Sequence, residues 1–131
     1  MKENKLEVII IEDEGIFALD MKCKLTGWGF EVTYIEDNYY DAIERMNQKM
    51  PDLVITDINI KGLIDGIEAA KYLRYTCNVP SLFISSRNDS ETFERISGLK
   101  PIGFLIKPLN DEMFYNIMHQ FKDSGSYHRK S

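Results

Sequence analysis

The chain has 131 residues, the length of one ordinary domain, and 44% of them are apolar, which supports a packed core and excludes wholesale disorder. Acidic residues outnumber basic ones by 21 to 16, and the net charge of −5 argues against direct nucleic-acid binding. No apolar run approaches the roughly 18 residues of a membrane span, and the N-terminus lacks the pattern of a signal peptide. The 2 cysteines lie far apart, so we expect a reduced cytoplasmic protein without a zinc site or a disulfide framework.

Five short apolar runs recur along the chain and predict β-strands. Four of them are continuous, which is typical of parallel strands buried on both faces. The run at residues 30–34 alternates between apolar and polar residues and is the best candidate for an edge strand. The continuous runs are Val8–Ile11, Leu53–Ile55, Leu82–Ile84 and Phe104–Ile106.

Each apolar run is followed by a helix-length segment with start or stop signals. Gly27 and Gly29 are expected to end the first helix. Asn38 is expected to cap the second helix, which ends before Pro51, and Asn110 opens the fifth. The third and fourth helices are expected to begin with capping boxes, Asp65 with Glu68 and Asn88 with Glu91.

The five strand–helix units predict a doubly wound α/β fold, because right-handed crossovers place helices on both faces of a parallel sheet. We expect the domain to cover residues 1–122 and residues 123–131 to form a polar, mobile tail. Sheets of this kind bind ligands at the carboxyl ends of their strands, so a functional site is expected there.

Polar side chains follow four of the five predicted strands. Glu12 and Asp13 follow the first, Asp57 the third, Ser85 the fourth and Lys107 the fifth. Each of them alone has an ordinary explanation as a helix cap, a first-turn acid or a turn residue. Together they would meet at one edge of the sheet, where three carboxylates repel one another unless a cation lies among them. Oxygen ligands at a partly wet edge suit Mg²⁺.

Such a cluster is suited to phosphoryl transfer. A divalent ion beside Lys107 would stabilise the negative charge on the oxygens of a phosphoryl group during transfer. Asp57 is then the candidate nucleophile and would form an acyl phosphate. The hydroxyl of Ser85 could donate a hydrogen bond to the attached phosphoryl group.

Four stretches of the chain resemble the receiver domains of two-component response regulators. They are IIIEDE (9–14), LVITDINIKGLIDGIEAA (53–70), PSLFISS (80–86) and GFLIKP (103–108). The similarity spans about residues 6–121 and implies a flavodoxin-like sheet with the strand order 2-1-3-4-5. It also implies that a histidine kinase or a phosphotransfer protein phosphorylates Asp57.

The resemblance also assigns a metal site. Glu12 and Asp13 match the acidic pair that holds Mg²⁺ together with Asp57, and the backbone carbonyl of Asn59 matches the remaining protein ligand. The longer side chain of Glu12, in place of an aspartate found in some members, is expected to reach the ion through water.

Further roles concern the phosphoryl group and the response to it. Lys107 matches the lysine that pairs with the phosphoryl group, and its bond to Pro108 is expected to be cis. Ser85 matches the switch hydroxyl and Phe104 the switch aromatic, which would move inward after phosphorylation. Ser86 stands where alanine is frequent and makes that position more polar.

Ser86, Asn59 and Arg87 are expected to modulate the lifetime of the acyl phosphate. Asn59 and Arg87 each lie two residues beyond a reactive position, and we expect them to flank the path of the hydrolytic water. The protein would thus be a phosphoacceptor that promotes its own phosphorylation and dephosphorylation rather than an enzyme with a separate substrate.

The resemblance implies that the fourth helix, the fifth strand and the fifth helix form the face that regulates a partner or an output domain. This face could also support a homodimer, and neither a membrane nor direct nucleic-acid binding is expected. Since the chain stops soon after the fifth helix, it would be either a stand-alone phosphoryl shuttle or a receiver excised from a larger regulator or hybrid kinase.

Three alternatives compete with this interpretation. Haloacid-dehalogenase-like phosphatases need a second acid two residues after the nucleophile, where this chain has Asn59. A flavodoxin-type flavin carrier needs a phosphate loop after the first strand, where residues 12–14 are all acidic and would repel a phosphate. A receiver that has lost phosphorylation is disfavoured by the complete set of site residues.

Overall fold

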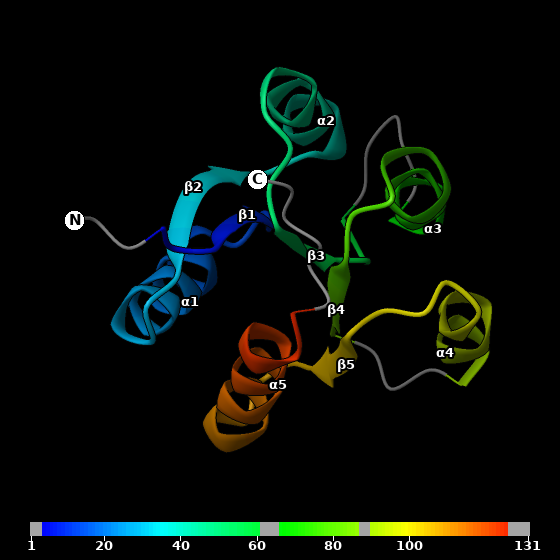
Figure 1. Ribbon diagram of the computed structural model, residues 1–131. Coiled ribbons are helices and arrows are strands. Elements are labelled where there is room, and N and C mark those ends of the chain that lie inside the picture. Colours follow the sequence, from blue (N-terminus) through cyan, green and yellow to red (C-terminus); the bar gives the residue numbers. More distant parts are fainter. Residues whose placement is uncertain (1–3, 61–65, 87–89, 126–131) are drawn as a thin grey trace.

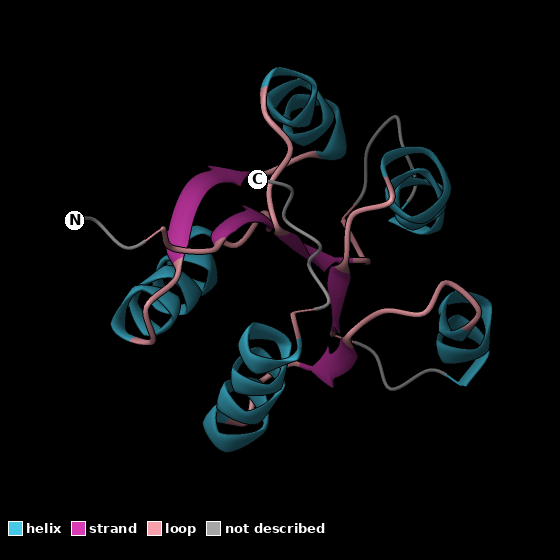
Figure 2. Ribbon diagram, viewed as in Figure 1, coloured by secondary structure: helices cyan, strands magenta, loops and turns pink. Residues whose placement is uncertain are grey.

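The predicted strands lie side by side in one parallel sheet in the computed structural model, which describes residues 4–60, 66–86 and 90–125 (Figures 1 and 2). Their order across the sheet is β2-β1-β3-β4-β5, so the predicted doubly wound fold is confirmed. The strands are β1 (Glu7–Ile11), β2 (Glu31–Glu36), β3 (Leu53–Asp57), β4 (Ser81–Ser85) and β5 (Gly103–Ile106).

Helices cover both faces of the sheet (Figure 1). Helices α1 and α5 pack on one face, and α2, α3 and α4 pack on the other. Their bounds are α1 (Gly15–Gly27), α2 (Tyr39–Gln48), α3 (Gly66–Lys71), α4 (Ser90–Ser97) and α5 (Asp111–Ser124), and a π-helical segment, η1 (Tyr72–Cys77), follows α3 directly. Among the described residues, no helix is long and apolar enough to cross a membrane.

The continuous apolar runs are explained by burial on both faces of the sheet. Successive residues of a strand point to opposite faces, so a central strand needs apolar side chains at every position. In β1, Val8 and Ile10 pack in the cluster formed with α1 and α5. Ile9 and Ile11 pack in the cluster formed with α2 and α3. Every residue of β3 and β4 is buried.

The two edge strands differ from the central ones. Strand β2 lies at one edge and is only partly buried, as its alternating sequence predicts. Strand β5 lies at the other edge, and only Leu105 is buried there, while Gly103, Phe104 and Ile106 are partly exposed. The expectation that the fifth run is buried on both faces was wrong, since this strand has a neighbour on one side only.

The two predicted asparagine caps and the predicted end of the first helix are confirmed, whereas the fifth helix runs further than expected. The Asn38 side chain accepts a hydrogen bond from the backbone N–H of Asp41, and the Asn110 side chain accepts one from Met113. Helix α1 ends at Gly27 as expected. Helix α5 continues to Ser124, inside the segment expected to be a tail.

Other sequence expectations fall outside the described part of the chain or differ from it. Asp65 and Asn88, the expected first residues of two capping boxes, lie outside the described residues, as do residues 126–131 of the expected tail. The third helical segment changes to a π-helix at Tyr72 and ends at Cys77, and the next residue, Asn78, has a left-handed φ of 53°. Asn tolerates this conformation better than most residues, so it can stop the helix there.

Strand β5 lies very close to helix α5, and this contact can be tested at Gly103. A Cβ atom at Gly103 would lie 2.8 Å from Ile117 Cδ1 and 3.1 Å from Leu82 Cδ1. Because overpacking displaces both side chains, Gly103→Ala should lower the free energy of unfolding by about 1–2 kcal/mol in urea denaturation. The matched control is Gly27→Ala, where nothing lies within 4 Å of the added carbon. Equal stability of the two variants would contradict the close contact.

Candidate functional site

Three carboxylates gather at the carboxyl end of the sheet. Glu12 and Asp13 follow β1, and Asp57 is the last residue of β3, which is paired with β1. One carboxylate oxygen from each residue lies within 4.8 Å of the others, so the cluster could hold a metal ion. Glu12 and Asp57 are buried, with 2% and 4% of their surface exposed, whereas Asp13 is exposed to solvent.

Lys107 follows β5 and reaches into this cluster from the edge of the sheet. Its Nζ donates hydrogen bonds to Asp57 Oδ2 at 2.9 Å and to Glu12 Oε2 at 3.0 Å. It also donates to Glu14 Oε1 at 2.5 Å and lies 4.5 Å from the centroid of the Phe17 ring. One ammonium group is therefore shared by three carboxylates and lies over an aromatic face, a favourable position for a cation.

The contacts of Lys107 raise its pKa. Burial alone lowers the pKa of this ammonium group, but the hydrogen bonds to Glu14, Asp57 and Glu12 outweigh burial and raise the pKa above its usual range. The side chain is therefore positively charged throughout the physiological pH range. A fixed positive charge at this place can stabilise added negative charge on a group that binds next to Asp57.

The environment of Glu12 fits a divalent cation. Burial raises the pKa of this carboxyl group, while hydrogen bonds from the Glu14 N–H and from Lys107 offset part of the rise. Glu12 Oε1 lies 3.0 Å from Lys107 Nζ, but the hydrogen bond goes to Oε2, and the buried Oε1 has no hydrogen-bond partner. This oxygen is therefore in an ion pair but accepts no hydrogen bond, and a hard cation is a partner that carboxylate oxygens prefer.

The Asp57 carboxylate is held at both of its oxygens. Oδ1 accepts a hydrogen bond of 2.7 Å from the backbone N–H of Asn59, and Oδ2 accepts the one from Lys107. The buried hydroxyl of Tyr39, at the start of α2, donates to the backbone carbonyl of Asp57. The sequence indicated no such role for Tyr39.

Ser85 is wholly buried at the end of β4 and contacts the loop that follows β3. Its hydroxyl donates to Asn59 Oδ1 at 2.8 Å, and the backbone N–H of Ser86 donates to the same oxygen at 2.8 Å. The hydroxyl expected to reach a phosphoryl group thus contacts an amide in this structure. Sequence reasoning considered Asn59 for its backbone carbonyl and its location, and missed this side-chain contact.

The remaining expected site residues are placed as follows. Phe104 is half-buried on β5 and makes an edge-to-face contact with Phe93 of α4, with 5.4 Å between the ring centroids. The Lys107–Pro108 peptide bond is cis. Arg87 lies outside the described residues.

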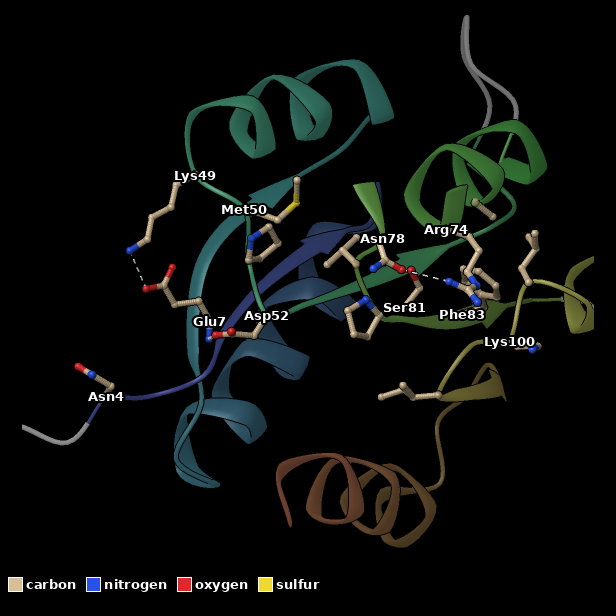
Figure 3. Close-up of a pocket in the computed structure, with 16 residues that line it drawn as sticks. Asn4, Glu7, Lys49, Met50, Asp52, Arg74, Asn78, Ser81, Phe83 and Lys100 are labelled. Carbon is tan, nitrogen blue, oxygen red and sulfur yellow. Dashed lines mark hydrogen bonds and ion pairs between the residues drawn. The ribbon is translucent and has the colours of Figure 1, made fainter. Parts of the chain in front are cut away.

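A separate polar cavity of about 900 Å³ lies at the opposite, amino-terminal edge of the sheet (Figure 3). Its lining includes Glu7 at the start of β1 and Asp52 just before β3. Lys49 Nζ lies 2.9 Å from Glu7 Oε2, and the Asp52 carboxylate accepts a hydrogen bond from the Glu7 N–H. These charges are engaged with one another, so the strand-end cluster is the better candidate for chemistry.

Comparisons with known proteins agree on the family. A family model described as the response regulator receiver domain matches residues 8–119. The sensory transduction protein BceR of Bacillus subtilis (strain 168) is 29% identical over 122 residues, which are 92% of this chain and 52% of that protein. The uncharacterized transcriptional regulatory protein YrkP of the same strain is 31% identical over 126 residues, 94% of this chain and 52% of that protein. The chain thus spans about half the length of these curated relatives.

Solved structures support the same fold. The signal receiver domain of a modulated diguanylate cyclase from Desulfovibrio desulfuricans G20 superposes with a TM-score of 0.83 at 29% identity, covering 96% of this chain and 100% of that one. A putative response regulator from Chloroflexus aurantiacus J-10-fl superposes with a TM-score of 0.79, covering 91% of this chain and 99% of that one. Its identity of 23% makes it evidence for the fold alone.

The acidic cluster leads to a prediction about metal binding. Mg²⁺ should raise the melting temperature of the protein, because an ion that binds only the folded state stabilises it by about 2.7 kcal/mol at 100 times its dissociation constant. Asp13→Asn should lose most of this effect, since it removes one of the three carboxylates. Glu94→Gln, an exposed acid on α4, is the control and should respond like the wild type. Equal Mg²⁺ responses of the two variants in thermal denaturation would exclude the cluster as the site.

Proposed function

Because this chain belongs to the response regulator receiver domain family, we propose that it accepts a phosphoryl group on Asp57 and transmits the resulting change to a partner or an output domain. One observation carries the proposal. The Asp57 carboxylate is fixed between the N–H of Asn59 and the ammonium group of Lys107, beside two further acids that could hold a cation. This is the environment that an attacking carboxylate needs.

The proposed transfer is an in-line displacement at phosphorus. A carboxylate oxygen of Asp57 forms the new bond to phosphorus, while the bond from phosphorus to the imidazole nitrogen of a phosphohistidine donor breaks and its electron pair leaves with the nitrogen. With acetyl phosphate as the donor, the leaving group is acetate. Lys107 carries a positive charge next to the reacting oxygens and stabilises the charge that moves there.

The donor set fits a divalent cation, and we assign it to Mg²⁺. Glu12, Asp13, Asp57 and the backbone carbonyl of Asn59 are the proposed ligands, and the unsatisfied Oε1 of Glu12 supports this assignment. When bound there, the ion would neutralise negative charge on the phosphoryl oxygens. The all-oxygen donor set and the exposure of Asp13 suit an ion that keeps part of its water shell.

Hydrolysis would return the protein to its starting state. Water attacks phosphorus, the bond to the Asp57 oxygen breaks, and inorganic phosphate leaves while the carboxylate is regenerated. We propose that Asn59, Ser86 and Arg87 modulate this step. Asn59 and Ser86 both lie at the end of the sheet near Asp57, and the role of Arg87 stays a sequence-based prediction.

The proposed output face consists of α4, β5 and α5. Ser85 and Phe104 are the proposed switch, and the edge-to-face contact of Phe104 with Phe93 links β5 to α4. Two large apolar side chains on α4 and α5 are exposed, and they could be covered by an output domain, a partner or a second copy of the chain. They are Phe93 with 51% and Met113 with 53% of their surface exposed.

A protein donor would have to approach Asp57 from the open end of the sheet. Helix α1 begins there, directly after Glu14, and presents Ile16 with 87% and Leu19 with 57% of their surface exposed. Apolar side chains next to a reactive site favour contact with another protein surface. We therefore propose that the donor is a histidine kinase or a phosphotransfer protein that contacts the start of α1.

The nucleophile assignment can be tested by one substitution. Asp57→Asn should reduce phosphorylation by acetyl phosphate and Mg²⁺ to background, because an amide cannot form the acyl phosphate. Intact-protein mass spectrometry measures the added phosphoryl group. Asp123→Asn, which changes an exposed acid on α5, is the control and should be phosphorylated at the wild-type rate. A phosphorylated Asp57→Asn protein formed at the wild-type rate would refute the assignment.

The charge of Lys107 can be tested in the same assay. Lys107→Gln should slow phosphorylation by about 100-fold, the usual effect of losing one preorganised donor to developing charge. Lys122→Gln, on α5 and outside the acidic cluster, serves as the control. Rates of both variants within a factor of about two of the wild type would show that Lys107 takes no part in the transfer.

A further inference from the structure

The side-chain amide of Asn59 joins the two loops that follow β3 and β4. Its Oδ1 accepts hydrogen bonds from Ser85 Oγ at 2.8 Å and from the backbone N–H of Ser86 at 2.8 Å. Ser86 Oγ lies within hydrogen-bond distance of the same oxygen, at 3.3 Å. A backbone N–H can only donate, so the atom that faces it is the amide oxygen and not the amide nitrogen. An O–H and an N–H from one strand end therefore converge on a single oxygen of the neighbouring loop.

The other end of the same residue contacts the phosphoacceptor. The Asn59 N–H donates to Asp57 Oδ1 at 2.7 Å, so one residue touches Asp57 through its backbone and Ser85 through its side chain. Ser85 is also fixed from the opposite side, because its backbone carbonyl accepts a hydrogen bond from the Lys107 N–H at 2.8 Å. The hydroxyl of Ser85 is thus held at the end of β4 by its bond to the residue that contacts Asp57.

We propose that the amide oxygen of Asn59 takes the place of a phosphoryl oxygen in the unphosphorylated protein. This inference rests on the proposed function, since it assumes that a phosphoryl group on Asp57 is the alternative acceptor for these donors. In this role Asn59 is a positioning residue that competes with the phosphoryl group for the Ser85 hydroxyl and the Ser86 N–H. Before these two donors could bind the phosphoryl group, their hydrogen bonds to Asn59 would have to break.

The strengths of the two acceptors make this competition effective. A hydrogen bond to a charged oxygen is roughly twice as strong as one to a neutral amide, so the phosphoryl group wins once it is attached. Before attachment, the bonds to Asn59 stabilise the arrangement in which Ser85 and Ser86 contact the loop after β3. In one state Ser85 and Ser86 donate to Asn59, and in the other they donate to the phosphoryl group. The difference in strength between these two sets of hydrogen bonds determines how far phosphorylation shifts the equilibrium between the states.

Beryllofluoride, an analogue of a phosphoryl group on a carboxylate, provides the test. We would titrate it into the wild type, Asn59→Ala and the control Asn47→Ala, each in Mg²⁺ shown by titration to be saturating. Removing a neutral competing acceptor should tighten beryllofluoride binding about fivefold in Asn59→Ala and leave Asn47→Ala, an exposed position on α2, unchanged. Asn59→Leu keeps the length of the side chain without its acceptor. If Asn59→Ala folds poorly, Asn59→Leu replaces it and should show the same tighter binding of beryllofluoride.

A second readout separates competition from a general structural effect. In nuclear magnetic resonance spectra without beryllofluoride, the Ser86 amide proton should move upfield in Asn59→Ala, because it loses its acceptor, and with beryllofluoride it should match the wild type. In a Ser85→Ala background, Asn59→Ala should increase the affinity for beryllofluoride by less, since one of the two donors for which the acceptors compete is gone.

The outcomes distinguish this inference from the proposed function. If the wild type does not bind beryllofluoride, or if Asp57→Asn binds it equally well, both this inference and the proposed function fail. If the wild type binds beryllofluoride through Asp57 but Asn59→Ala and Asn59→Leu bind it equally or more weakly, the inference alone is overturned. An unchanged Ser86 amide resonance in the Asn59 variants would overturn it as well.

Discussion

The site depends on one ammonium group that is shared by three carboxylates. Lys107 donates to Glu12, Glu14 and Asp57, and two of these acids are buried or nearly so. Their mutual repulsion would otherwise favour protonation or an opening of the cluster. One positive charge does not balance the carboxylates gathered here, which include Asp13. The cluster is therefore tolerable in the fold yet still electrostatically suited to one more cation.

The sheet explains why these charges meet at all. Parallel strands end at the same edge, and the register that pairs β1 with β3 and β3 with β4 brings Asp57 close to both Glu12 and Ser85. Apolar side chains on both faces fix the backbone of the central strands. Asp57 and Ser85 therefore belong to the sheet itself, whereas Asn59 and Ser86 lie on the loops that follow it.

Much of this arrangement could be predicted from the sequence, because the signals are local. Continuous apolar runs indicated the central strands, and the caps Asn38 and Asn110 marked two helix starts. The exposure of β5 could not be predicted from its run of apolar residues, since it depends on the position of the strand at the edge of the sheet. The π-helical turn at Tyr72–Cys77 likewise has no clear local signal.

Within the site, the structure places Glu12, Asp57 and Lys107 in contact or close together at one end of the sheet, but several contacts of the predicted residues were missed. Glu14 has the sequence position of an ordinary first-turn acid, and Phe17 that of an ordinary core residue of a helix. Only the three-dimensional path of Lys107 shows that both contact its ammonium group. The bond from Ser85 to Asn59 joins the end of β4 to the loop after β3, which are 26 residues apart in sequence, so no spacing pattern predicts it.

The burial of Asp57 also limits how a signal can leave the site. A phosphoryl group there would replace the single negative charge of the carboxylate with about two, a net gain of about one negative charge on a chain that already carries a net −5. One added charge changes the overall field of the molecule little. Under the proposed function, the signal would leave the site as displaced atoms through the packed contacts of β4, β5 and α4, and a binding partner would recognise altered shape.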